Sequence, residues 1–450
     1  MNLENSLKLV DKNLYDIEIF GLGYVGFPLA VRLATKGIHV IGIDINKKRI
    51  ERLRNGELMD SETHLKTEFL EIIQKRSLEL ENESKNSSNP KIGIICVPTP
   101  IPNQKIESDT YVISAVESFL AKAKKGDLII LESSIEIGTT EKIQELIVSK
   151  GYQIGKDFGL CFCPERIDPS NKEWGIENIP RVIYCSDDSS FKIAKEIYLH
   201  VNGGNLLKVN SPKIAEIVKS FENAFRLVNI TLVNELAILC DKLDVNVKEI
   251  IDAASTKPFG FLPHYPGAGA GGHCIPKDPR FLLESAKKQG IKFDTIEHAL
   301  KINEQMPKYI ANAIENQLQT RRLRKNVLVC GLSYKANVED MRDSPSFKII
   351  TELKNKDIEV FGYDPFFNPN LIEKYLTENH ISELNFTKLD DLDDKTIKQI
   401  SCMCIVQHHD ESESRIKQIY EKSLIPFIYD CQSKLLKNAQ SNSHLEFLGN

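Results

Sequence analysis

The sequence predicts an α/β protein in which two doubly wound domains are joined by a central helical domain with a long helix. Short apolar strands alternate with helices near both ends of the chain. Between them, residues 211–243 have apolar residues at helical spacing and no glycine. Alternating strands and helices form a parallel sheet with helices on both faces. We expect the three domains at residues 1–210, 211–320 and 321–450.

The composition excludes several classes of protein. A length of 450 residues allows about three domains. The hydrophobic share of 41% and the net charge of −5 are ordinary for a globular protein and give no basic footprint for nucleic acid. The N-terminal residues lack a secretory pattern, and no apolar run approaches the ~18 residues of a membrane span. We expect a cytoplasmic protein without nucleic-acid or membrane partners.

The ten cysteines are expected to be buried, reduced thiols, because a cytosolic chain keeps thiols reduced. CFC (161–163) and CMC (402–404) have the spacing that places both cysteines on one face of a strand. His408 and His409 follow the second pair, beyond the expected end of the strand, and are expected at the surface. Neither pair has the spacing of a metal site.

The first domain begins with a strand, a glycine-rich turn and a helix. Its expected elements are strands at 16–20, 39–44, 91–97 and 127–133, a helix at 27–35 and a polar loop at 81–90. This order predicts a βαβ unit that opens a parallel sheet.

The turn GLGYVG (21–26) has the spacing of a Rossmann-like dinucleotide fingerprint. Gly21 would form the tight turn, Gly23 would let a pyrophosphate approach the backbone, and Gly26 would allow close packing of helix on strand. Asp44 ends the next strand and would accept hydrogen bonds from ribose hydroxyls, which favours NAD over NADP. The alternative is a structural turn without a cofactor.

Polar residues follow two later strands of the same domain. Thr99 lies in CVPTP (96–100) and Ser134 in ESS (132–134). Ligands bind at the carboxyl edge of such a sheet, so we expect both near the nicotinamide half of the cofactor. The alternative is that they are polar turn residues.

Residues 211–243 are expected to form one long helix, with Pro212 in its first turn. So long an apolar helix is typical of a surface that packs against a partner subunit. Lys219 and Asn223 share one face of this helix and can stabilise a developing oxyanion together. Alone, Lys219 would be interpreted as a solvated surface lysine.

A second α/β domain follows RRLRK (321–325). NVLVCGLSYK (326–335) is expected to be a strand and a glycine turn, and IEVFGYDP (358–365) a second strand that ends in Asp364. The turn lacks GxGxxG, so this domain is not expected to bind a second NAD in the usual way. The edge of its sheet still offers a place for a nucleotide.

Cys274 lies in GGHCIPKDP (271–279), a stretch that favours neither helix nor strand. Asp278 follows four residues later, and Glu165 lies in CFCPERIDP. Taken separately, the aspartate before proline would be a turn or cap residue and the Glu–Arg pair a surface pair.

Together these features resemble the UDP-glucose/GDP-mannose dehydrogenase family, from about Ile17 to Ser433. The resemblance rests on GLGYVG (21–26), VPTP (97–100), CPER (163–166), KSFENAFRLVNITLVNE (219–235), GGHCIPKDP (271–279) and GLSYKANVEDMRDSP (331–345). It implies oxidation of a sugar C6 alcohol to a carboxylate with two NAD+. In that reaction Cys274 attacks the aldehyde, the thiohemiacetal becomes a thioester, and water releases the acid.

The resemblance also implies roles for individual residues. The implied catalytic residues are Cys274, Lys219, Asn223, Asp278, Glu165 and Ser134. The implied cofactor-binding residues are Gly21, Gly23, Tyr24, Val25, Gly26, Asp44, Arg49, Pro98, Thr99, Ser134, Lys277 and Arg342. The implied substrate-binding residues are Glu165, Arg166, Lys219, Asn223, Phe259, Gly271 and Lys335. No metal is implied, the C-terminal domain would bind the UDP moiety, and a homodimer would form on the central helix.

Two stretches, 249–276 and 164–183, are similar to the UDP-N-acetylglucosamine 6-dehydrogenase branch, so we expect that substrate. UDP-N-acetylmannosamine, UDP-N-acetylgalactosamine and UDP-glucose are the alternatives. The chain departs from the family at Ser134, where the branch often has threonine, and at Gln432, where an arginine is common. A two-electron hydroxyacid dehydrogenase would not need Cys274, and a non-catalytic scaffold would not keep all the reactive residues.

Overall fold

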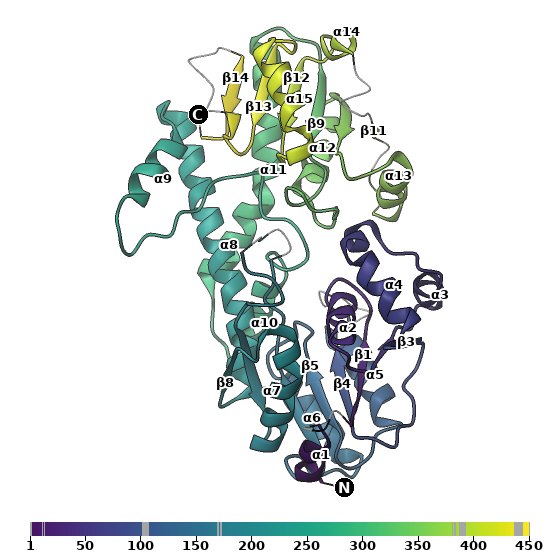
Figure 1. Cartoon of the computed structure of the whole chain (residues 1–450). Helices are drawn as coiled ribbons and strands as arrows, with labels where there is room; N and C mark the ends of the chain where they lie inside the picture. The colour runs from purple at the N-terminus through teal and green to yellow at the C-terminus, as the bar shows by residue number, and fades with distance from the viewer. Residues whose placement is uncertain are drawn as a thin grey trace. The chain divides into compact units, whose positions relative to one another are not determined.

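The computed structural model shows two compact units, Met1–Phe221 and Glu222–Asn450, with helix α8 (Pro212–Leu243) running from one into the other (Figure 1). The structure describes residues 2–10, 12, 14–100, 108–168, 171, 173–379, 381, 384–386, 393–435 and 444–449, with the backbone alone at 60 and 61. Residues 169, 170 and 172 of the stretch 164–183 therefore lie outside the described residues.

The first unit is built on an eight-stranded sheet in the order β3-β2-β1-β4-β5-β6-β7-β8. Its strands are β1 Asp16–Phe20, β2 Val40–Ile43, β3 Leu78–Glu81, β4 Lys91–Ile95, β5 Leu128–Leu131, β6 Gly159–Phe162, β7 Arg181–Cys185 and β8 Leu206–Val209. Neighbouring strands are parallel except β6 and β7, which are antiparallel.

Helices cover both faces of this sheet. They are α1 Leu3–Val10, α2 Gly26–Thr35, α3 Lys47–Arg54, α4 Lys66–Gln74, α5 Thr110–Leu120, α6 Thr139–Ser149 and α7 Asp188–Asn202, with the 3-10 helix η1 Asp60–Leu65. Leu128 and Ile130 of β5 belong to the core under α2 and α7, whereas Ile129 and Leu131 belong to the core under α5 and α6. Strands buried on both faces are apolar at every position, which is why β5 has no polar alternation.

The second unit combines helices with a six-stranded parallel sheet in the order β11-β10-β9-β12-β13-β14. Its strands are β9 Asn326–Cys330, β10 Glu359–Tyr363, β11 Asn385–Phe386, β12 Cys402–Ile405, β13 Phe427–Asp430 and β14 Leu445–Phe447. Its further helices are α9 Val247–Ser255, α10 Asp278–Lys288, α11 Asp294–Thr320, α12 Pro345–Lys354, α13 Pro369–Glu378, α14 Asp394–Ile397 and α15 Asp410–Glu421. Helices α11 and α12 pack on one face of this sheet and α15 on the other.

The predicted fold class is confirmed, since two α/β sheets flank a helical segment that contains the predicted long helix. The first strand was predicted at its observed bounds, and the later strands predicted in the first domain are two or three residues shorter in the structure. The predicted parallel sheet is interrupted once, at the antiparallel β6–β7 pair.

Three expectations are wrong. Cys161 and Cys185, register partners on β6 and β7, form a disulfide instead of remaining free thiols. His408 and His409 are buried, because each is bonded to a buried aspartate. By length and composition alone, Pro212–Leu243 would also reach across a membrane, contrary to the expectation that no stretch approaches that length. That property is shared by long helices of globular proteins and does not identify a span.

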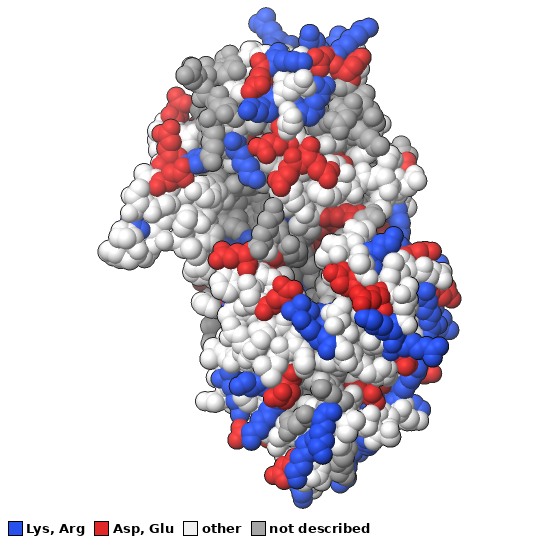
Figure 2. Space-filling view, viewed as in Figure 1, with Lys and Arg blue, Asp and Glu red and all other residues white. Residues whose placement is uncertain are grey.

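The surface charge agrees with the composition. Figure 2 shows acidic and basic side chains intermixed over the visible face, as the net charge of −5 leads one to expect. By contrast, the segment that follows α9 is almost free of charge in this view.

Candidate active site

The glycine turn between β1 and α2 has the geometry of a phosphate cradle. Gly21 has φ of +90°, and a Cβ there would lie 2.7 Å from the carbonyl oxygen of Cys96. A Cβ on Gly26 would lie 2.0 Å from the carbonyl oxygen of Gly21, so only glycine allows the helix to start this close to the strand. At Gly23 a Cβ would meet nothing within 4 Å, which leaves the backbone open toward the start of α2.

Asp44 is fixed beside this turn. Its Oδ2 accepts the N–H of Leu22 at 3.0 Å, and its Oδ1 accepts the N–H of Asn46 at 2.8 Å. The residue is only half-buried, so each oxygen keeps a lone pair that a ligand hydroxyl can use. The open backbone at Gly23 and this carboxylate together fit an adenine dinucleotide.

Arg49 supports the turn from within the protein. Its Nε donates to the carbonyl oxygen of Leu22 at 3.1 Å, and its guanidinium pairs with Glu62 and lies 5.2 Å from the ring centre of Phe27. Arg49 is thus buried under the glycine turn that it was predicted to serve. The other residues predicted near the cofactor differ in exposure: Tyr24 and Pro98 are exposed, Val25 is half-buried and Thr99 is buried.

The two serines after β5 have different environments. Ser133 is buried and its hydroxyl donates to the carbonyl oxygen of Val97 at 2.7 Å. Ser134 is half-buried. The hydroxyl predicted to act is therefore the more accessible of the two.

Glu165, which follows β6, has a tightly bound carboxylate. Its Oε1 accepts the N–H groups of Arg166 at 2.6 Å and Ile167 at 2.7 Å, and its Oε2 pairs with Arg181. Arg181 was not among the residues predicted from the sequence. Its only signal was a charged residue at the start of an otherwise uncharged strand, Arg181–Cys185.

In the second unit, Cys274 is the exposed one among the eight cysteines of the described chain that lie outside the Cys161–Cys185 disulfide. The glycines before it hold its loop against the segment between β9 and α12. The N–H of Gly272 donates to the carbonyl oxygen of Arg342 at 3.1 Å, and a Cβ on Gly272 would lie 2.6 Å from the ring of Tyr334. The carbonyl oxygen of Cys274 accepts the N–H of Asp278 at 2.9 Å, which leads the chain into α10.

His273, the neighbour of Cys274, is neutral at pH 7. Burial, together with the positive charges of Lys277 and Arg342, lowers the pKa of His273 to about 4. An imidazolium at this position is therefore not available to stabilise a thiolate.

Asp278 links three of the predicted residues. It is fully buried, and its Oδ2 accepts a hydrogen bond from Asn223 Nδ2 at 2.6 Å. Its Oδ1 lies 3.6 Å from Lys277 Nζ, which also lies 5.5 Å from the ring centre of Phe281. Lys219 precedes Asn223 by one turn of α8 and belongs to the first unit.

The remaining predicted residues have the following positions. Arg342 makes a two-nitrogen contact with Asp340, at 3.0 Å from Nε and 2.6 Å from Nη2. Arg166 Nη1 donates to the carbonyl oxygen of Pro180 at 2.9 Å. Phe259 is exposed and Lys335 half-buried, while a Cβ on Gly271 would lie 2.7 Å from the carbonyl oxygen of Asp343.

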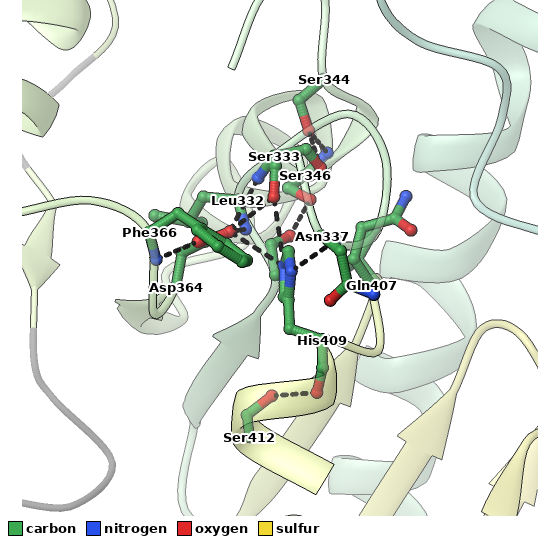
Figure 3. A network of polar contacts seen from close by, with 12 residues as sticks. Leu332, Ser333, Asn337, Ser344, Ser346, Asp364, Phe366, Gln407, His409 and Ser412 are labelled. Atoms are coloured by element: carbon green, nitrogen blue, oxygen red, sulfur yellow. Dashed lines mark hydrogen bonds and ion pairs between the residues drawn. The ribbon is translucent and has the colours of Figure 1, made fainter. Parts of the chain in front are cut away.

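The second α/β domain has a glycine turn and an aspartate arranged as in the first, but here the protein's own side chains occupy the aspartate. Gly331 has φ of +86°, and Asp364, at the end of β10, accepts the N–H of Leu332 at 2.7 Å, as Asp44 accepts that of Leu22. Here, however, the carboxylate also accepts the Ser333 hydroxyl at 2.8 Å and His409 Nε2 at 3.2 Å (Figure 3).

His409 is held as a donor to this carboxylate. Its Nδ1 accepts the N–H of Asn337 at 3.0 Å, so the ring proton lies on Nε2 and points to Asp364 (Figure 3). Burial alone would raise the pKa of Asp364, but the hydrogen bond from His409 is among the contacts that hold it below its usual value. Asp364 is thus fully buried among internal donors and does not offer the ribose contact that Asp44 offers.

Gln432, at the position where an arginine was expected from the family, is turned inward. Its Nε2 donates to the carbonyl oxygen of Val406 at 3.1 Å and to Gln407 Oε1 at 2.8 Å. The side chain therefore supports the strand end after β12. Over the part of the chain that the structure describes, no group of three His, Cys, Asp or Glu side chains could hold a metal ion.

Comparison with known proteins decides the family. Three domain profiles of the UDP-glucose/GDP-mannose dehydrogenase family match consecutive parts of the chain. They are the NAD binding domain over residues 15–202, the central domain over 213–305 and the UDP binding domain over 328–437. The chain belongs to the UDP-glucose/GDP-mannose dehydrogenase family.

Relatives within the family are similar over most of their length. A UDP-N-acetyl-D-mannosamine dehydrogenase of Methanococcus vannielii is 34% identical over 443 residues, 96% of each chain. A UDP-N-acetyl-D-glucosamine 6-dehydrogenase of Pseudomonas aeruginosa is 33% identical over 355 residues, 78% of this chain and 82% of its own. The solved structure of the UDP-D-ManNAc dehydrogenase of Pyrococcus horikoshii has a TM-score of 0.81 at 29% identity, covering 96% of this chain and 99% of its own.

The family membership confirms the predicted resemblance and cofactor. The chain is a UDP-sugar dehydrogenase, and its cofactor is NAD. The open backbone at Gly23 and the half-buried Asp44 are the features of this structure that fit NAD.

Proposed function

We propose that the chain oxidises the C6 alcohol of UDP-N-acetylglucosamine to the carboxylate, a four-electron oxidation that proceeds through a thioester on Cys274. The observation that carries this proposal is the exposure of Cys274, since the other free cysteines of the described chain are buried or half-buried. A two-electron dehydrogenase has no use for a thiol, whereas a thiol that adds to the aldehyde allows a second oxidation.

NAD held by the glycine turn and Asp44 would supply the hydride acceptor for both oxidations. Lys219 and Asn223 hold the C6 oxygen, where negative charge develops as the alcohol is oxidised. Cys274 Sγ then attacks the aldehyde carbon to form a thiohemiacetal. After the second oxidation a water breaks the C–S bond of the thioester, and the thiol is regenerated with release of the acid.

The environment of each group supports these roles. Asp278 accepts from Asn223 at 2.6 Å and so orients its amide, which leaves the amide oxygen and the second N–H for substrate or water. Glu165 and Ser134 act through water in the hydrolysis. The proposed cofactor contacts are the glycine turn, Asp44, Thr99, Lys277 and Arg342.

The sugar is proposed from the stretches 249–276 and 164–183, which are similar to the UDP-N-acetylglucosamine branch. UDP-N-acetylmannosamine is the second candidate, because several similar relatives bear that name. The two sugars differ only in configuration at C2. Discrimination therefore rests on contacts to the N-acetyl group and not on the reacting carbon.

A panel of UDP-sugars assayed for NADH formation tests this proposal. UDP-N-acetylglucosamine is expected to give the highest kcat/KM, with two NADH for each sugar consumed. A higher kcat/KM for UDP-N-acetylmannosamine or UDP-glucose would show that this sugar is the preferred substrate. It would not contradict the proposed four-electron oxidation. One NADH per sugar would refute the four-electron reaction itself.

Asp44 is proposed to set the preference for NAD. Its carboxylate, fixed by Leu22 and Asn46, would repel the 2′-phosphate of NADP and accept the ribose hydroxyls of NAD. Asp44→Ala is expected to raise the KM for NAD by about tenfold, the loss of about 1.4 kcal/mol of hydrogen bonding to a charged group. The KM for NADP should fall or stay constant; equal use of both cofactors by the wild type would contradict this role.

We also propose that the chain is cytoplasmic and has three domains, at residues 1–210, 211–320 and 321–450. It is further proposed to form a homodimer through α8. Phe225, Leu232 and Leu239 are exposed along α8, and Phe259 and Leu262 are exposed in the segment after α9. A second copy of this chain is the occupant that would cover them. Sedimentation at the mass of two 51.0 kDa chains would support the dimer, and the mass of one would refute it.

A further inference from the structure

We infer that Arg181 is a positioning residue that holds the carboxylate of Glu165 for the hydrolysis of the thioester, and that Glu132 and Tyr198 hold Arg181 in turn. The inference rests on the proposed function, because it assigns a task to Glu165 in the last step of that reaction. Arg181 itself touches neither the substrate nor the reacting atoms. All four residues belong to the first unit.

Arg181 lies fully buried between two carboxylates. Its Nη2 pairs with Glu165 Oε2, and its Nη1 lies 3.0 Å from Glu132 Oε2. The Tyr198 hydroxyl donates to Glu132 Oε1, and the Tyr198 ring centre lies 5.1 Å from the guanidinium carbon of Arg181. A buried charge of this kind is stable only when its partners are fixed, so the four side chains form one rigid set.

This arrangement leaves Glu165 with little freedom. Two backbone N–H groups hold Oε1, at 2.6 Å and 2.7 Å, and the guanidinium holds Oε2. A carboxylate has about four acceptor positions. Protein donors occupy three of these positions on Glu165. The fourth is left to accept a hydrogen bond from the water that hydrolyses the thioester.

The cluster has an unequal charge balance. One cation, Arg181, serves two carboxylates, Glu132 and Glu165. Burial raises the pKa of Glu132, and the positive charge of Arg181 opposes this rise. Three further titratable groups near the cluster are neutral. Burial raises the pKa of Cys163 to about 12, and burial also raises the pKa values of Cys96 and Tyr198 well above their usual ranges.

Arg181 and Glu132 have opposite electrostatic effects on the Glu165 carboxylate. The guanidinium of Arg181 attracts this carboxylate, whereas the carboxylate of Glu132 repels it. The two partners must therefore have opposite effects on the pH at which hydrolysis fails on the acid side. A network that only stabilised the fold would have no such signature.

Glu132→Gln is the main test, because it keeps the shape of the side chain and removes one negative charge. The acid limb is the part of the pH profile in which the rate of thioester hydrolysis falls as the pH is lowered. We expect this limb to move to lower pH by about 1 pH unit. Arg181→Lys keeps the charge but cannot contact both carboxylates with one planar group. In this variant we expect the limb to move to higher pH and the thioester to hydrolyse about a hundredfold more slowly.

The main measurement is the lifetime of the acyl-enzyme as a function of pH, followed by rapid quenching and intact-protein mass. The burst of NADH from the first oxidation is measured in parallel and should be unchanged. Glu18→Gln is the matched control, because Glu18 forms an equally buried pair with Lys91, at 3.3 Å, within the same sheet. It should lower the thermal stability without moving the pH profile.

Unchanged profiles in both variants, with losses of stability like that of Glu18→Gln, would overturn the inference and reduce the cluster to a structural role. If Arg181→Lys does not fold, Glu132→Gln alone decides, since a limb that stays in place or moves to higher pH contradicts the charge argument. A wild type that forms one NADH per sugar and no acyl-enzyme would refute the proposed function. If the wild type forms two NADH per sugar and the pH profiles of the variants do not move, only the inference is refuted.

Discussion

Cys274→Ala is expected to abolish steady-state conversion of the UDP-sugar to the acid. The second oxidation needs a tetrahedral carbon that bears a hydrogen and a hydroxyl group and can release hydride, and addition of the thiol to the aldehyde supplies it. The first oxidation needs only a base and an oxyanion site. A single turnover with up to one NADH per enzyme is therefore expected to survive, and it can be measured by stopped-flow absorbance.

Cys274→Ser tests whether the reaction needs the nucleophilicity of the thiol or only a side chain of that shape. A hydroxyl has a far higher pKa than a thiol, so it attacks weakly, and an ester hydrolyses more slowly than a thioester. The variant should be nearly inactive and should accumulate a covalent sugar adduct, visible as a mass increase of the intact protein.

Cys240→Ala is the control for the loss of a thiol, because Cys240 is buried on α8 in the same unit. It should still give two NADH per sugar. Turnover of Cys274→Ala to the acid at a rate near that of the wild type would make this cysteine structural and would remove the central support of the proposed function.

Lys219→Ala is expected to lower kcat by about 10²–10³ with little change in substrate affinity. Removal of one preorganised donor from a developing oxyanion has an effect of this size. The neutral alcohol of the ground state gains little from the ammonium, so binding should be almost unchanged. Steady-state kinetics with a separate binding measurement distinguishes the two quantities.

Lys213→Ala provides the comparison, because Lys213 lies on the same helix and forms a half-exposed pair with Glu141, at 2.8 Å. Surface pairs of this kind contribute little, so this variant should retain wild-type kinetics. A loss of affinity at constant kcat in Lys219→Ala would show that Lys219 binds the substrate and does not stabilise the transition state.

Local features of the chain were predictable because their causes are local. The glycine turn follows from its own backbone, since Gly21 has φ of +90° and a Cβ on Gly26 would lie 2.0 Å from the carbonyl oxygen of Gly21. The strand Asp16–Phe20 and the helix Pro212–Leu243 follow from the spacing of their apolar residues. The sequence by itself therefore determined the two sheets, the long helix and the position of the candidate cofactor turn.

The tertiary structure alone decided which polar groups meet. Glu132, Glu165 and Arg181 follow or begin three different strands, and only the order of these strands in the sheet makes one arginine the partner of two carboxylates. His409 closes the Asp364 turn across 45 residues of sequence, although that turn begins like the one at Asp44. Such contacts cannot be found from propensity or periodicity, because a charged group is buried only where distant segments, brought together by packing, supply its partners.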